Sequence, residues 1–420
     1  MSRSRDASSK DPTEARIPGV PATTRLLNAF LTPTLASRHT PDDVFDGLVF
    51  EARAAFGDGE ADDTAIDDFR VLLGAFARAT QFTALGWQTA LMDLQVRVEN
   101  RIRVRRQHRL EPAIGTVEVR APVFVAALPR TATALVRGVL AKSPAHRAPL
   151  LWEMACTETA QPEEVRHRHF RRTARLYRSL GRLVPKALHA TELDMAAPGD
   201  CAHLLPHGGH HLLRADLPEY RQWLANRDFT ADYAFLKQAL QVLQYGRPPA
   251  RWVIEAPANL GRFEAIRRIF PDAVIVWVHR DPMTVLGSHC GLVEASWALH
   301  QRHSDPRGIG PAWLAMVSKA IERSRRAWTT LPREAIVDVA YERLAGDPGA
   351  WLPWLYERIG SRWSAIDEAN LARVRAEPAA GRAHEHELAR YGLGPAEAET
   401  AFGDYPRLVD RLATARHVLR

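Results

Sequence analysis

Residues 123–136 read VFVAALPRTATALV, an apolar run that ends abruptly in a polar turn containing Arg130. Helix-forming sequence follows from Leu135 to Lys142. A buried strand that turns directly into a helix points several backbone N–H groups at one spot, and α/β proteins hold phosphate in this way. The stretch therefore predicts an α/β fold with an anion site just after this strand.

A second apolar run, residues 274–282, reads VIVWVHRDP and also ends in an arginine, Arg280. A guanidinium at the end of a strand suits bidentate contacts with phosphate or sulfate. Together, the two strand ends predict a site for a doubly anionic nucleotide.

These segments resemble known motifs. Residues 128–135, LPRTATAL, resemble the P-R-S-G-T-T-L loop of sulfotransferases that use 3′-phosphoadenosine 5′-phosphosulfate (PAPS). Residues 279–282, with Ser288 six positions later, resemble the 3′-phosphate motif of that family. The likeness covers about residues 115 to 405, and it is closest to the bacterial branch that acts on small molecules. It continues through residues 147–153, 240–244, 252–260, 337–344 and 381–386.

The expected fold class is α/β. Residues 113–420 are expected to form a P-loop-like three-layer domain with a central parallel sheet, because candidate strands alternate with helices. Those strands are residues 123–128, 252–255, 273–279 and 335–339. Residues 22–112 are helical in pattern and predict an N-terminal helical subdomain, with a helix start at Pro41 and an apolar face of Val44, Leu48, Ala52 and Ala55. Residues 1–21 predict a disordered tail.

Composition narrows the class of protein. The net charge of +7 favours anionic ligands, but no nucleic-acid-binding motif accompanies it, so we expect no nucleic-acid partner. The 3 cysteines are widely separated and indicate reduced thiols. No stretch reaches the roughly 18 apolar residues of an integral membrane segment, and the first residues lack a secretory signal. A cytoplasmic location is therefore expected.

The first loop is the expected site of the 5′-phosphosulfate. By resemblance, Arg130, Thr131 and Thr133 hold it together with the loop backbone, whereas an ordinary helix capped by Thr131 is the alternative. Ala132 stands where the family has glycine, and Ala134 stands where it has threonine. The loop also lacks the G-x-x-x-x-G-K-[ST] pattern of Mg²⁺-dependent nucleotide hydrolases, so no metal is expected.

The second strand end is the expected site of the 3′-phosphate. By resemblance, Arg280 and Ser288 contact that phosphate, and Arg382 belongs to a late segment that closes over the nucleotide. Tyr341, just past the last strand, approaches the adenine or packs in the core. A local ion pair between Arg280 and Asp281 is the alternative to phosphate binding.

Glu153 is the first candidate for the catalytic base, since similar sulfotransferases carry a carboxylate there, and a partly buried glutamate has a raised pKa. The alternatives are a surface glutamate paired with arginine and the histidine cluster between His203 and His211. Glu255 is the largest departure, because related sequences commonly have lysine there. A desolvated carboxylate would repel a sulfonate by roughly several kcal/mol.

The resemblance implies a PAPS-dependent sulfotransferase that moves a sulfuryl group to a hydroxyl of a small-molecule acceptor, with Glu153, Arg130 and Glu255 at the reacting centre. Two alternatives stay open. In the first, the fold is reused for cofactor-independent elimination or cyclisation, with Glu153 and Glu255 as paired carboxylates. In the second, the protein is a non-catalytic nucleotide-binding relative.

Overall fold

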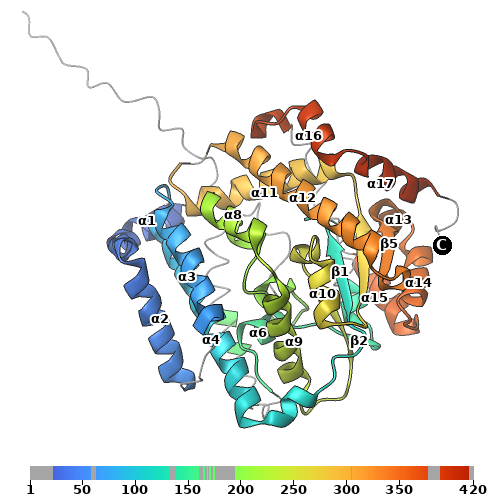
Figure 1. The fold of residues 1–420 in the computed structure, drawn as a ribbon, viewed down its shortest axis with the longest axis horizontal. Coiled ribbons are helices and arrows are strands. Elements are labelled where there is room, and N and C mark those ends of the chain that lie inside the picture. Colours follow the sequence, from blue (N-terminus) through green and yellow to red (C-terminus); the bar gives the residue numbers. More distant parts are fainter. Residues whose placement is uncertain are drawn as a thin grey trace, which may run out of the picture.

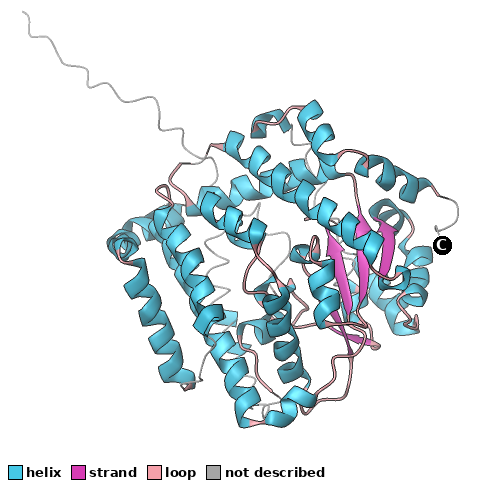
Figure 2. Cartoon of the chain, viewed as in Figure 1, coloured by secondary structure: helices cyan, strands magenta, loops and turns pink. Residues whose placement is uncertain are grey.

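A computed structural model describes residues 22–57, 63–129, 131, 138–159, 164–165, 168, 170–171, 174–175, 194–303, 305–376 and 388–415. The predicted tail, residues 1–21, lies outside this range, as do Arg130, residues 132–137 and residues 377–387. In the described part, a small sheet lies on one side of the molecule and helices make up the rest (Figure 2).

The sheet confirms the predicted α/β class. Its five strands are ordered β2-β3-β1-β4-β5, and every neighbouring pair is parallel. The strands are β1 (Val123–Ala127), β2 (His146–Arg147), β3 (Arg251–Glu255), β4 (Val274–His279) and β5 (Ile336–Ala340). The expected strands match β1, β3, β4 and β5 to within a residue or two. The short edge strand β2 was not predicted.

Alternating side chains of the strands enter two separate cores, because successive residues of a strand point to opposite faces of a sheet. Phe124 and Ala126 of β1 join one core, and Val123 and Val125 join the other. Trp277 of β4 enters the first core in the same way. Both faces of the sheet are therefore covered, which explains why these strands are continuous apolar runs.

The N-terminal helices lie on the far side of the molecule from β5 (Figure 1). They are α1 (Ala22–Leu31), α2 (Pro41–Phe56), α3 (Asp63–Arg78) and α4 (Ala84–Leu110), with a 3₁₀ segment η1 (Thr32–His39). Helix α2 begins at Pro41, as expected. Its buried face is centred on Phe45, Val49 and Ala52, whereas Val44 and Leu48 lie at the margin and Ala55 is exposed.

Helices also connect and cover the strands on both sides. They are α6 (Leu151–Ala155), α8 (Pro218–Asn226), α9 (Thr230–Gln244), α10 (Phe263–Ile269), α11 (Pro282–His300), α12 (Ile309–Thr330), α13 (Tyr341–Gly346), α14 (Pro348–Arg358), α15 (Ala365–Ala376), α16 (Pro395–Phe402) and α17 (Tyr405–Thr414). Shorter 3₁₀ segments include η5 (Cys201–His203), η6 (Gly209–Leu213) and η7 (Pro257–Asn259).

One fully buried side chain, Asn259 of η7, fastens two strand ends together. Its Nδ2 donates to the carbonyls of Val125 in β1 and Ile254 in β3, both at 3.0 Å. Its Oδ1 accepts from the Tyr233 hydroxyl of α9, also at 3.0 Å. Because each of these buried groups is satisfied, Asn259 fixes the separation of the β1 and β3 ends, where the candidate site begins.

Candidate functional site

A cavity of about 350 Å³ lies at the carboxyl ends of β1 and β3. Leu128 and Pro129 after β1, and Glu255 at the end of β3, form one side of it. Segments η5, η6, η7, α9, α11 and α12, with the loops around Phe229 and Arg262, complete the lining. In open α/β sheets, ligands bind outside the carboxyl ends of the strands, so this is the expected place for a substrate.

The cavity lining is mostly apolar, with a few polar groups among the apolar side chains. The apolar part includes Leu205, Leu213, Phe229, Leu260, Met316 and Val317. The polar side chains are Asp200, His207, His210, Tyr233, Glu255, Arg262 and His289. Arg262 stacks on the Phe229 ring at 3.4 Å, and burial lowers its pKa to about 10. A lining of this kind suits a small apolar molecule that is oriented by a few polar contacts.

Of the residues predicted to bind the 5′-phosphosulfate, Thr131 is the one that the structure describes. Its side chain is 2 % exposed, and its Oγ1 has no hydrogen-bond partner among the described residues. Buried hydroxyl groups are nearly always hydrogen-bonded, so an unsatisfied one at the end of β1 requires an explanation. The other predicted loop residues, Arg130, Ala132, Thr133 and Ala134, lie outside the described residues.

Two of the residues predicted for the second anion site lie next to each other. The Arg280 guanidinium, just after β4, lies over the Tyr341 ring at 4.2 Å, just after β5. Asp281 caps helix α11, which begins at Pro282, by accepting from the Thr284 backbone at 2.8 Å. Ser288 lies further along α11 and is half-buried. Arg382 falls outside the described residues.

Glu153 lies in a buried clamp between two arginines. Its Oε1 accepts from Arg147 and from Arg247, each at 2.9 Å. Its Oε2 accepts from the Leu150 backbone at 3.1 Å. The side chain is 3 % exposed and is not among the residues that line the cavity. These contacts favour the arginine-paired alternative for Glu153, and its role as a base stays a prediction.

Glu255 does line the cavity and is 6 % exposed. Because Glu153 is not in the lining, the cavity does not bring Glu153 and Glu255 together as a pair of carboxylates. Of these two glutamates, Glu255 is therefore the one whose carboxylate would contact a ligand in the cavity.

Two residues of the histidine cluster line the cavity, whereas His203 and His211 are not among its lining residues. His207 and His210 line the cavity, and the His210 ring lies 4.1 Å from the ring of His211. Neither ring nitrogen of His210 has a hydrogen-bond partner among the described residues. Burial, followed by the nearby His211, holds the pKa of His210 well below its usual value. In the part of the chain that the structure describes, no group of His, Cys, Asp or Glu has the arrangement of a metal site.

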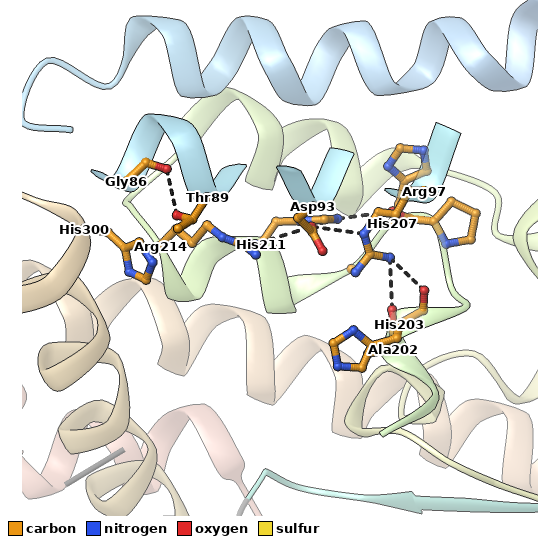
Figure 3. A network of polar contacts seen from close by, with 12 residues as sticks. Gly86, Thr89, Asp93, Arg97, Ala202, His203, His207, His211, Arg214 and His300 are labelled. Atoms are coloured by element: carbon orange, nitrogen blue, oxygen red, sulfur yellow. Dashed lines mark hydrogen bonds and ion pairs between the residues drawn. The ribbon is translucent and has the colours of Figure 1, made fainter. Parts of the chain in front are cut away.

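A buried network of polar contacts joins the segment that contains His203 to His211 to helix α4 (Figure 3). Asp93 accepts from Arg97 Nε at 3.0 Å and lies 3.5 Å from Arg214 and 3.6 Å from His211. Arg97 in turn donates to the carbonyl of Leu205 at 2.6 Å. Burial opposes ionisation of Asp93, but the charges of Arg97 and Arg214 outweigh it and hold the Asp93 pKa well below its usual range.

Sequence reasoning missed this network. The spacing of Asp93 and Arg97, four residues apart, indicates an ion pair on a helix. Nothing local indicates that the loop around residue 205 lies against it.

Comparisons with known proteins were made on sequence and on structure. A family model described as "Sulfotransferase family" matches residues 122–365, which is more than half of the chain. The structure is similar to the crystal structure of sulfotransferase STF1 from Mycobacterium tuberculosis, with 25% identity, 85% of this chain and 98% of that chain covered, and a TM-score of 0.71. It is also similar to sulfotransferase STF9 from Mycobacterium avium, with 22% identity, 87% and 96% coverage, and a TM-score of 0.76. No curated protein sequence matches the chain.

Helices long and apolar enough to cross a bilayer were not found among the described residues.

Acidification is expected to destabilise the protein. Burial lowers the pKa of His211 and of His300 from 6.5 to about 3. Below pH 6.5 the unfolded chain therefore binds protons that the folded protein does not, so the free energy of unfolding falls as the pH falls from 6.5 towards about 3. Between about pH 7 and pH 5 each histidine contributes a loss of roughly 2 kcal/mol. Thermal unfolding followed across this range checks the slope, which His300→Gln should reduce. An unchanged Tm would contradict the expectation.

Proposed function

The chain belongs to the sulfotransferase family, and from this premise we propose that it transfers a sulfuryl group from PAPS to a hydroxyl group of a small, mainly apolar acceptor. The buried hydroxyl of Thr131 carries the proposal, because its Oγ1 has no hydrogen-bond partner among the described residues and an anionic ligand at the end of β1 would supply one. The donor supplies an activated sulfonate, and the residues of this chain bind it, orient the acceptor and remove its proton.

Two strand ends would hold the donor. In the proposal, Arg130, Thr131 and Thr133 bind its 5′ end, together with the loop backbone at Ala132 and Ala134. Arg280 and Ser288 bind its 3′-phosphate, and Arg382 closes over it. The stacking of Arg280 on Tyr341 supports the second site, because it holds a planar cation beside an aromatic ring that suits adenine.

The cavity indicates the class of acceptor. Its volume of about 350 Å³ lies at the lower end of the range of about 300–1,000 Å³ that small-molecule sites occupy. Because apolar side chains dominate the lining, a compact alcohol or phenol fits better than a sugar or a peptide.

His210 is the base that the described geometry favours. It lines the cavity, and as a neutral imidazole with unpartnered nitrogens it can accept the proton of an acceptor hydroxyl. Its low pKa makes it a weak base in the ligand-free protein, but the negative charge of a bound donor would raise that pKa towards neutrality.

A second candidate function rests on Glu255. A carboxylate facing an apolar cavity suits proton abstraction in an elimination or cyclisation, whereas it would repel a sulfonate. This alternative needs no donor nucleotide.

Binding of 3′-phosphoadenosine 5′-phosphate, measured by calorimetry, tests the donor assignment. We expect binding of the nucleotide that Arg280→Ala weakens roughly tenfold to hundredfold, since one charge-assisted phosphate contact is lost. The matched control is Arg326→Ala, an exposed arginine on α12, which should leave affinity unchanged. Absence of binding at millimolar nucleotide would contradict the proposal.

Replacing His210 tests the base. With PAPS and 2-naphthol as a model apolar acceptor, His210→Gln should lower kcat by roughly 10²–10⁴-fold and leave nucleotide affinity unchanged. Glu153→Gln is the comparison, and its unfolding midpoint should be recorded, because it breaks a buried pair. A full loss of kcat in a folded Glu153→Gln protein, with His210→Gln still active, would restore Glu153 as the base.

Glu255→Gln separates the two functions. Sulfuryl transfer to 2-naphthol should persist or rise in this variant, because the repulsion of the sulfonate is removed. If the protein instead catalyses an elimination or cyclisation, that conversion should be abolished. Product analysis by mass spectrometry distinguishes the two results.

A further inference from the structure

A second hollow, which we call the α14–α17 groove, has a volume of about 830 Å³. It lies between α14 and α17, with β5, α13 and the end of α12 at its base. It shares no lining residue with the cavity at the ends of β1 and β3. Nothing in the proposed transfer reaction uses it. Its volume is nevertheless within the range of small-molecule sites.

Three tryptophans contribute to the apolar part of the groove. Trp328, Trp351 and Trp354 all line it, and the last two rings lie edge to face at 5.3 Å. Trp328 is 47% exposed, yet its Nε1 donates to Asp338 Oδ2 at 2.9 Å, so the ring is held in place. An exposed tryptophan with a fixed orientation provides a flat surface on which an aromatic ligand can stack at little entropic cost.

Arginines give the groove a positive charge. Arg333, Arg343, Arg358 and Arg411 line it, against the acidic Glu334 and Asp338. Both oxygens of Asp338 already accept hydrogen bonds, one from Trp328 and one from His279 Nε2 at 2.9 Å. Among the described residues, no carboxylate forms an ion pair with these arginines.

Arg343 is the best-placed cation of the groove. Its guanidinium lies over the Trp351 ring at 4.1 Å, and its Nη2 donates to the Ala415 carbonyl. Its Nε is buried and has no acceptor within the described part of the chain. A buried guanidinium N–H without a described acceptor, beside tryptophans that lie edge to face, indicates an anionic ligand group.

Other occupants fit less well. A strand added to β5 has no room, because Val339 and Ala340 are 2% and 1% exposed and α17 packs against this edge. If residues 416–420, RHVLR, occupied the groove, these basic residues would face the arginines of its lining. A second copy of the chain that docked through the same surface would likewise place arginine against arginine.

We propose that the α14–α17 groove binds an aromatic anion, a flat apolar body that bears a sulfate or carboxylate. The tryptophans contact the body, and Arg343, Arg358 and Arg411 contact the anionic group. The proposal stands independently of the proposed transfer reaction. That reaction would nevertheless produce aryl sulfates, which are one class of such ligands.

Calorimetry with 1-naphthyl sulfate and with 1-naphthoate tests the site on the full chain. We expect binding of at least one of these anions, and no comparable binding of neutral 1-naphthol. Arg358→Glu and Arg411→Glu should each weaken the anion roughly tenfold or more. Both residues are exposed, so both variants should fold. Arg407→Glu is the matched control, because Arg407 is exposed on the same helix as Arg411 but does not line the groove.

The outcomes identify the class of ligand and the results that would contradict the proposal. Binding of the sulfate alone identifies aryl sulfates as the ligand class, and binding of both probes identifies aromatic anions in general. Three results would overturn the proposal: no binding of either probe at millimolar concentration, equal binding of 1-naphthol, or affinity that the groove variants leave unchanged. The last result would place the probe in the cavity at the ends of β1 and β3. Tighter binding of a single-stranded oligonucleotide than of either probe would also overturn it.

Discussion

The parallel direction of the strands is the constraint on which the rest of the structure depends. Since all neighbouring strands in the sheet are parallel, their carboxyl ends meet at one edge, and the polar turns after β1, β3 and β4 lie there. Asn259 fixes the ends of β1 and β3 by hydrogen-bonding to both backbones. An apolar cavity, the buried Thr131 hydroxyl and the stacked Arg280 therefore lie at this edge.

The buried carboxylates near this edge are paired inside the protein. Glu153 lies between Arg147 and Arg247, and Asp93 lies near Arg97 and Arg214, so each group keeps a net positive charge. A buried ion pair adds little net stability, because desolvation offsets the attraction, but its geometry is strict. These pairs are thus better understood as fixing the position of the loops around the cavity. Glu255 differs from Glu153 because it lines the cavity itself.

The sequence predicted those parts of the fold and the site that local patterns encode. The apolar runs of β1 and β4, buried on both faces, were recognisable, as was the proline-led start of α2. β2 has only two residues and no pattern of its own. The burial of Glu153 depends on Arg247, which lies 94 positions away in the chain. Likewise, the position of His210 depends on α4. Such long-range contacts leave no periodic signal, so the choice between Glu153 and the histidines could not be made beforehand.

The carboxylate of Asp338 joins two regions that otherwise share no residue. One oxygen is held by Trp328 in the α14–α17 groove, and the other by His279, the residue immediately before Arg280. Because one carboxylate accepts from both rings, the indole and the imidazole are held at a fixed separation, and the groove is tied to the backbone just before Arg280.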